Sequence, residues 1–182
     1  MAISSTRPQA LPPLRRVLIV GGGGREQALA WALSRNEEIT TVWIAPGNGG
    51  PEGLAIDLAE TDSEALVAFC CQKDVDLVVV GPEAPLAAGV ADALRSADIA
   101  VFGPDAAGAQ LEASKAWAKQ LMHEAAVPTA GHWSVHSEDE ALAVLHELKR
   151  PLVVKADGLA AGKGVTVAET VAEAEAAIQE AF

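Results

Sequence analysis

A glycine-rich stretch near the C-terminal end of the sequence has the residue types that bind phosphate. Two lysines, Lys155 and Lys163, bracket it with positive charge, and it contains Gly158, Gly162 and Gly164. Glycines let backbone N–H groups approach an anion, because no side chains intervene. A Walker A loop requires Ser or Thr directly after its lysine, whereas Gly164 follows Lys163 here. In a chain of net charge −12, the stretch predicts a phosphate-bearing ligand bound without P-loop chemistry.

Short apolar runs at 152–154 and 165–167 flank this stretch, so we expect a strand, a loop and a second strand. Lys155 ends the first strand, where a lysine is rare without a partner; it is either a phosphate contact or a member of a structural ion pair. Lys163 is either a phosphate contact or a solvated loop residue. Asp157 is better interpreted as a brace of the loop, through a hydrogen bond to backbone, than as a metal ligand.

A second glycine cluster, Gly21–Gly24, follows an apolar run at 17–20 and precedes Arg25 and Glu26. A strand, a glycine-rich turn and a helix together place phosphate at a helix N-terminus. The dinucleotide fingerprint does not fit, because its third glycine would fall on Glu26 or Gln27, and no acidic residue follows the second strand. We therefore expect a mononucleotide or a sugar phosphate rather than NAD. A tight turn without a ligand is the alternative.

The elements that must position these residues alternate between strands and helices. We expect strands at 17–20, 42–45, 77–80 and 100–102, and helices near 26–34, 63–72 and 87–96. Such alternation predicts a parallel sheet with right-handed crossovers. The loops after Val20, Ala45 and Val80 all follow the carboxyl ends of strands. We expect them to converge on the edge of the sheet where ligands bind.

A second unit is predicted to begin near 104–109, with a helix over 114–125 and a short strand around Trp133. Ser137 and Thr170 are each followed three residues later by Glu, a pattern that predicts capping boxes and two helices of about a dozen residues. The last helix reaches Phe182 without a C-cap, so we interpret the chain as cut within a longer protein.

Six motifs together resemble one family. They are Gly23-Gly24-Arg25-Glu26, Ala45-Pro46-Gly47-Asn48, Val80-Gly81-Pro82-Glu83-Ala84-Pro85-Leu86, Phe102-Gly103-Pro104, Leu111-Glu112-Ala113-Ser114-Lys115, and the stretch from Lys155 to Val165. In this order they are similar to the N-terminal part of the phosphoribosylamine–glycine ligases (glycinamide ribonucleotide synthetases) of the ATP-grasp superfamily. The resemblance covers Arg16 to Phe182, and the family continues for more than twice this length. Two departures are Gly22, where the family usually has Asn, and Gln27, where it has His.

The resemblance implies an α/β fold: a Rossmann-like parallel-sheet domain that binds phosphoribosylamine at 15–105, followed by the beginning of an ATP-grasp domain at 106–182. Residues 1–14 are expected to be a disordered extension. The implied reaction is ATP-dependent ligation of glycine to 5-phosphoribosylamine through a glycyl phosphate, which forms glycinamide ribonucleotide in purine biosynthesis. ATP, glycine and 5-phosphoribosylamine are the implied small-molecule partners.

The resemblance also implies two sets of site residues. The residues implied to bind ATP are Lys115, Lys155, Gly158, Gly162, Lys163 and Gly164. The residues implied to bind the other substrates are Gly23, Gly24, Arg25, Glu26, Pro46, Gly47, Asn48, Gly81, Pro82 and Glu83. From the residues alone, Lys115 also fits a solvated lysine at a helix start, and Arg25, Asn48 and Glu83 also fit surface polar residues. ATP and Mg²⁺ are the implied cofactors; no metal ligand is named, and we expect the Mg²⁺ ligands beyond residue 182.

Composition excludes several other classes of function. Twelve surplus acidic charges disfavour a nucleic-acid partner, because phosphate backbones select basic surfaces. No apolar run approaches the roughly 20 residues of a membrane span. Residues 1–14 lack the apolar core of a secretory signal. The adjacent Cys70 and Cys71 do not form a disulfide framework, so we expect a reducing, cytoplasmic location.

Two other functions remain open at this point. A different ATP-grasp ligase or carboxylase would share the second unit but should lack the loops at 46–48 and 81–83. A non-catalytic module would keep only a sugar-phosphate site. Because the expected metal ligands lie beyond residue 182, we expect the 182-residue chain alone to form no glycinamide ribonucleotide.

Overall fold

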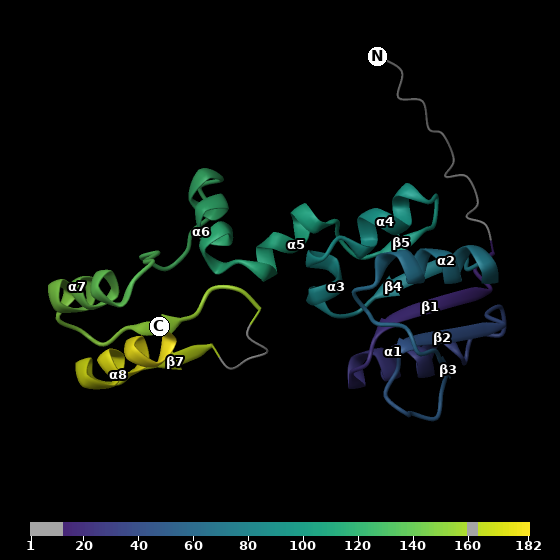
Figure 1. Cartoon of the computed structure of the whole chain (residues 1–182), viewed down its shortest axis with the longest axis horizontal. Helices are drawn as coiled ribbons and strands as arrows, with labels where there is room; N and C mark the ends of the chain where they lie inside the picture. Colours follow the sequence, from purple (N-terminus) through teal and green to yellow (C-terminus); the bar gives the residue numbers. More distant parts are fainter. Residues whose placement is uncertain (1–12, 160–163) are drawn as a thin grey trace, which may run out of the picture. The chain divides into compact units, whose positions relative to one another are not determined.

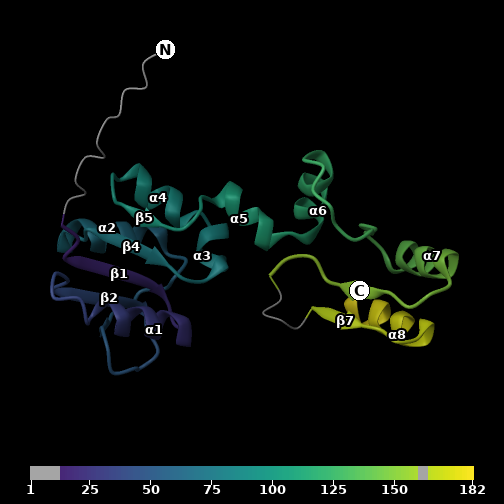
Figure 2. The same cartoon turned by 180° about the vertical axis from the view of Figure 1, so that it is seen from behind.

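The computed structural model describes residues 13–159 and 164–182, and its chain forms two compact units, Met1–Ala106 and Ala107–Phe182. Figures 1 and 2 show both units from opposite sides. The predicted strands at 152–154 and 165–167, and most of the predicted helices, are present within one or two residues of their expected bounds.

The first unit is built on a five-stranded sheet in the order β3-β2-β1-β4-β5, with every neighbouring pair parallel. Its strands are β1 (Arg16–Gly21), β2 (Thr41–Pro46), β3 (Leu54–Ala55), β4 (Leu77–Val80) and β5 (Val101–Phe102). Its helices are α1 (Gly24–Leu33), α2 (Ser63–Lys73), α3 (Glu83–Ala87) and α4 (Val90–Ser96). This arrangement confirms the predicted α/β class.

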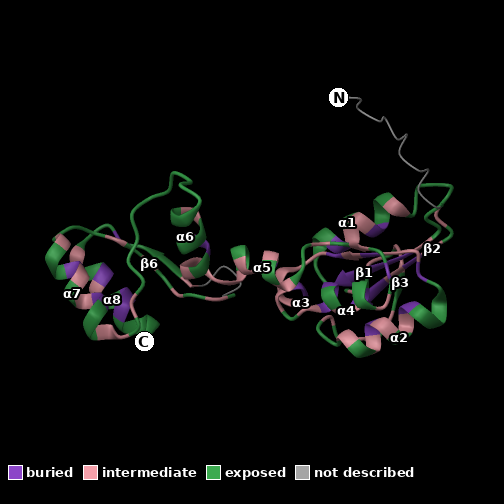
Figure 3. Cartoon of the chain, turned by 90° about the horizontal axis from the view of Figure 1, so that it is seen from above, coloured by how far each residue is buried: buried purple, intermediate pink, exposed green. Residues whose placement is uncertain are grey.

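Helices cover both faces of this sheet, with α1 on one side and α2 and α4 on the other (Figure 3). β1 lies at the centre, and its residues from Val17 to Val20 are completely buried. On the α1 side, Val17 and Ile19 pack with Ala30 and with Ile44 of β2. A continuous apolar strand is what a parallel sheet covered on both faces requires, because neither side of β1 reaches water.

The second unit contains helices on a short antiparallel hairpin. The hairpin consists of β6 (Val153–Lys155) and β7 (Val165–Val167), in which Val154 is paired with Thr166. Helices α6 (Lys115–Glu124), α7 (Glu138–Leu148) and α8 (Val171–Ala181) belong to this unit, and α5 (Ala106–Ala113) begins at the boundary between the two units. Leu145 of α7 and Ile178 of α8 share a buried cluster with Ala168 and Ala174.

The hydroxyls of Ser137 and Thr170 cap α7 and α8 as predicted, each accepting a hydrogen bond from the N–H three residues later at 3.2 Å. The return contacts differ from an ordinary capping box. The carboxylates of Glu140 and Glu173 accept from the N–H groups of His136 and Glu169, one residue before each cap, at 2.8 Å. The helix starts are therefore held by both side chains, over one residue more than the pattern predicts.

One predicted element is wrong, and one begins later than expected. The segment around Trp133 is not a strand, because residues 127–136 have neither helix nor strand structure. The helix expected at 87–96 is present as α4 but begins at Val90, because Gly89 adopts a left-handed conformation (φ 85°) as its N-cap, and Ala87 ends the separate helix α3.

Candidate functional site

The three glycine- and proline-rich loops of the first unit meet at the carboxyl edge of its sheet. Gly21 at the end of β1 is in register with Pro46 at the end of β2, and Val20 is in register with Val80 of β4. The Gly81 N–H also donates to the Val20 carbonyl at 2.9 Å. The predicted convergence of these loops is therefore present. β1 lies at the topological switch point of the sheet, because β2 and β4 flank it on opposite sides.

Glu26 is the buried charged residue that holds this edge together. The residue is only 3% exposed, and its carboxylate accepts hydrogen bonds from the Gly23 N–H at 2.7 Å and from Arg25 Nε at 2.8 Å. Burial alone would raise the pKa of Glu26. The hydrogen bonds from Arg25 and Gly23, together with the charge of Arg25, lower that pKa below its ordinary value. The carboxylate is thus ionised and has partners within its own loop.

Glycines make the space that Glu26 occupies. A Cβ atom added to Gly21 or Gly23 would lie 2.7 Å from a Glu26 side-chain atom, and one added to Gly81 would lie 2.0 Å from its Oε1 atom. Gly21 also has a φ of 129°, which other residues rarely adopt. By contrast, a Cβ on Gly24 would meet nothing within 4 Å. Gly21, Gly23 and Gly81 therefore serve the packing of Glu26, and Gly24 is the open position of the first loop.

Asn48 braces the second loop against the first. Its Nδ2 atom donates to the Gly23 carbonyl at 3.1 Å, and its Oδ1 atom accepts from the Gly50 N–H at 3.0 Å. Pro46 follows a cis peptide bond, and Gly47 has a φ of 81°. In the third loop, Pro82 is the N-cap of α3, which places the half-buried Glu83 in the first turn of that helix.

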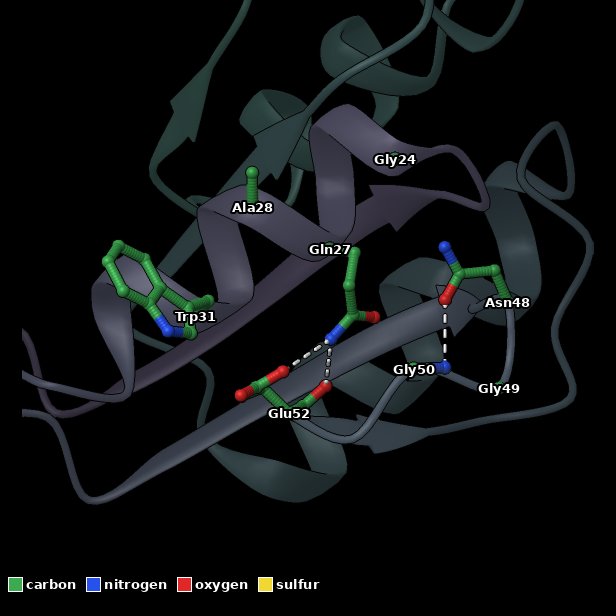
Figure 4. A pocket seen from close by; sticks show the side chains of 8 residues that line it. All are labelled: Gly24, Gln27, Ala28, Trp31, Asn48, Gly49, Gly50 and Glu52. Carbon is green, nitrogen blue, oxygen red and sulfur yellow. Dashed lines mark hydrogen bonds between the residues drawn. The ribbon is translucent and has the colours of Figure 1, made fainter.

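An open groove of about 630 Å³ lies beside these loops (Figure 4). Its lining residues are Gly24, Gln27, Ala28, Trp31, Asn48, Gly49, Gly50 and Glu52. Of the predicted substrate residues, this groove therefore contains Gly24 and Asn48.

The α1 side of the groove was missed by sequence reasoning. Gln27 Nε2 donates to the main-chain carbonyl and to the carboxylate of Glu52, both at 3.1 Å, while its buried Oε1 has no hydrogen-bond partner in the described part of the chain. Trp31 is 46% exposed, and the Arg35 guanidinium stacks 4.1 Å from its ring centroid. Gln27 and Trp31 are four residues apart on a predicted helix and therefore share one face of it. This spacing could have indicated the α1 side of the groove.

The second unit brings the predicted ATP residues of two segments together. Lys115, the first residue of α6, donates from Nζ to the Gly158 carbonyl at 2.9 Å. The Ala156 N–H donates to the Gly164 carbonyl at 2.8 Å, which extends the hairpin beyond Lys155. Lys155 is exposed at the end of β6. The predicted residues Gly162 and Lys163 lie outside the described residues.

Asp157 connects these segments. Its Oδ1 atom accepts from the N–H groups of Lys115 at 2.6 Å and Ala116 at 3.3 Å, and its Oδ2 atom accepts from the Ser114 hydroxyl at 2.9 Å. Desolvation acts to raise the pKa of Asp157, but these hydrogen bonds and one from the Gly158 N–H lower it below its ordinary value. The expected role of Asp157 as a brace is therefore present in the structure.

The described residues contain no group of three or more His, Cys, Asp or Glu side chains that could hold a metal ion. Within the same residues, no helix is long and apolar enough to cross a membrane.

Comparison with known proteins first defines the class. Residues 113–182 match the family model described as "Phosphoribosylglycinamide synthetase, ATP-grasp (A) domain". An ATP-grasp RimK domain protein from Sphaerobacter thermophilus shares the fold, with a TM-score of 0.61 at 20% identity over 91% of this chain and 58% of that chain. The class is thus ATP-grasp.

The family follows from the first unit. Residues 15–112 match the model described as "Phosphoribosylglycinamide synthetase, N domain", so the chain belongs to the phosphoribosylglycinamide synthetase family. A phosphoribosylamine–glycine ligase from Nostoc sp. is 50% identical over 171 residues, which are 92% of this chain and 40% of that protein. The crystal structure of a phosphoribosylamine–glycine ligase from Thermotoga maritima has a TM-score of 0.68 at 29% identity, over 88% of this chain and 38% of that chain.

The chain spans about 40% of the length of the curated relatives that it matches.

Proposed function

We propose that this chain supplies the sugar-phosphate site and the first nucleotide-binding segments of an enzyme that joins glycine to 5-phosphoribosylamine. The observation that carries this proposal is the contact of Lys115 Nζ with the Gly158 carbonyl, because it unites two predicted ATP segments that are 43 positions apart. The names of the relatives, phosphoribosylamine–glycine ligases, support this choice over other ATP-grasp reactions.

In the proposed reaction, a glycine carboxylate oxygen attacks the γ-phosphorus of ATP, and ADP leaves. The amine nitrogen of phosphoribosylamine then attacks the carbonyl carbon of the acyl phosphate. Phosphate leaves, the nitrogen loses a proton, and an amide remains. Such phosphoryl transfer depends mainly on positioning and charge neutralisation, which the ammonium groups of Lys115 and Lys155 would supply. Mg²⁺ would arrive with ATP, and we assign it no ligand among the described residues.

We assign residues 15–105 to the phosphoribosylamine-binding domain and residues 106–182 to the beginning of the ATP-grasp domain. Within the first domain, the open position at Gly24 and the groove beside it would accept the substrate. Glu26 and Asn48 would hold the loops in place, because their polar atoms bond to Gly23. We place the activity in the cytoplasm, which suits the free thiols of Cys70 and Cys71.

The test is product formation by the full-length enzyme that contains this chain. Release of ADP should require both glycine and phosphoribosylamine, and the product should be glycinamide ribonucleotide. ADP release with another carboxylate or amine, but not with this pair, would reject the proposed substrates while leaving the ATP-grasp class unaffected.

A further inference from the structure

We propose that Asp157 is a positioning residue that sets Lys115 for the nucleotide by clamping the start of α6 to the loop after β6. This role rests on the proposed function for its ligand, but the clamp itself is a property of the second unit. Asp157 lies 41 to 43 positions from its partners in the sequence, so its contacts join two distant segments.

The geometry of the clamp uses both carboxylate oxygens. One oxygen accepts the backbone N–H groups of Lys115 and Ala116, and the other accepts the Ser114 hydroxyl. That hydroxyl oxygen in turn accepts the Trp117 N–H at 3.1 Å as the N-cap of α6. Three of the four N–H groups that a helix start leaves without partners are thus satisfied by Asp157 and Ser114.

The clamp determines which groups at the start of α6 are available to bind an anion. A carboxylate already occupies its positive end, so a phosphate cannot take the same N–H groups. The positive charge available to a nucleotide from this helix is therefore the Lys115 ammonium. Lys115 is fixed at two points: its backbone N–H donates to Asp157 at 2.6 Å, and its Nζ atom donates to the Gly158 carbonyl at 2.9 Å.

This arrangement separates Asp157 from a catalytic group. Each of its oxygens has partners within the protein, and none of those partners is Lys155. Asp157 would act on the nucleotide only through the position of Lys115. Loss of the clamp should then weaken ATP binding without changing the affinity for glycine.

The first arm of the test measures amide hydrogen exchange in the 182-residue chain. Asp157→Ala should speed exchange at Lys115 and Ala116 by about tenfold or more, because charged hydrogen bonds protect both N–H groups. Asp157→Asn keeps an acceptor oxygen and should give an intermediate rate. Ser137→Ala, which removes the corresponding hydroxyl cap of α7, should leave both amides unchanged. Unaltered exchange at Lys115 and Ala116 in Asp157→Ala would overturn the clamp.

The second arm measures steady-state kinetics in the full-length enzyme. Asp157→Ala should raise the KM for ATP about tenfold and leave the KM for glycine within about twofold, with partial recovery in Asp157→Asn. An equal rise in both KM values, or no rise in either, would contradict a positioning role even if the hydrogen-exchange result were as expected. If the wild-type enzyme ligates other substrates, the proposed function fails, and the KM for ATP in that reaction still tests Asp157.

Discussion

The Glu26 carboxylate accepts a hydrogen bond of 2.7 Å from the Gly23 N–H, within the loop that was expected to bind an anion directly. One N–H group of this loop is therefore occupied by Glu26 and is not available to a ligand. The loop also contains a buried negative charge, which is paired to Arg25. Glu26 shapes the site from inside the protein.

Removing this carboxylate should destabilise the first unit. Glu26→Ala leaves the Gly23 N–H without its partner and opens space beneath Gly21 and Gly81, so we expect a loss of about 2–4 kcal/mol in its free energy of unfolding. Amide exchange of the β1 residues reports the stability of this unit separately. The matched control is Glu37→Ala, at an exposed glutamate. This substitution should change the free energy of unfolding by less than about 0.5 kcal/mol. A similar small effect at Glu26 would contradict its bracing role.

Neighbouring glycines in the first loop should respond in opposite ways to the same substitution. Gly23→Ala places a Cβ 2.7 Å from Glu26 Oε2 and should cost about 1–3 kcal/mol of unfolding free energy. In Gly24→Ala the added Cβ lies in open space in the first turn of α1, so the free energy of unfolding should stay equal or rise by up to about 1 kcal/mol.

Although Gly24→Ala should not destabilise the protein, it should weaken ligand binding. Because Gly24 lines the groove, its new methyl group should weaken the binding of ribose 5-phosphate in calorimetric titration while the protein stays folded. Undiminished affinity in Gly24→Ala would place the sugar phosphate elsewhere.

Lys155 should be required for use of the nucleotide. In the full-length enzyme, Lys155→Ala should reduce ATP-dependent ligation at least about tenfold, because a charged phosphate contact contributes about 1.5–3 kcal/mol. Arg150→Ala removes an exposed positive charge five residues away and serves as the control. Wild-type turnover in Lys155→Ala would show that this lysine does not contact the phosphates.

Acid should weaken the first unit through Asp76. Its carboxylate accepts from the backbone N–H groups of Arg15 and Arg16 at 2.9 and 2.7 Å. Desolvation raises its pKa, but these bonds and the charge of Arg16 lower it below the ordinary value of 3.8. Because the pKa of Asp76 is lower in the folded state than in the unfolded state, the ionised carboxylate stabilises the unit at pH values above the unfolded pKa. This stabilisation is lost as the pH falls through the folded pKa. Unfolding followed between neutral pH and about pH 2 should show this loss, and Asp76→Asn should reduce it.

The apolar runs allowed β1, β2 and β4 to be predicted closely, because strands buried on both faces leave a continuous pattern. The short exposed strand at Leu54–Ala55 leaves no such pattern and was missed. The helix at Glu83–Ala87 was also missed because its prolines indicate a loop. Pro82 is in fact the N-cap and Pro85 lies in the first turn, where a missing N–H costs no helical hydrogen bond.

The convergence of the three loops was predictable from the sequence, but the contacts within and between them were not. The convergence of three loops follows from parallel strands, which are visible in the sequence. The burial of Glu26 depends on Gly81, which is 55 positions away and joins it only through the pairing of β1 with β4. Likewise, the partners of Asp157 lie in a helix more than 40 positions earlier.

The shared space around Glu26 has a consequence for how this protein can change over generations. Gly23 and Gly81 both border this one side chain, so a replacement at either of them meets the same obstacle, whereas Gly21 is also restricted by its φ of 129° and by Pro82. A smaller residue at position 26 would remove that obstacle for Gly23 and Gly81 at once. The residues tolerated at positions 23 and 81 therefore depend on the residue at position 26, and these three positions should vary together rather than one by one.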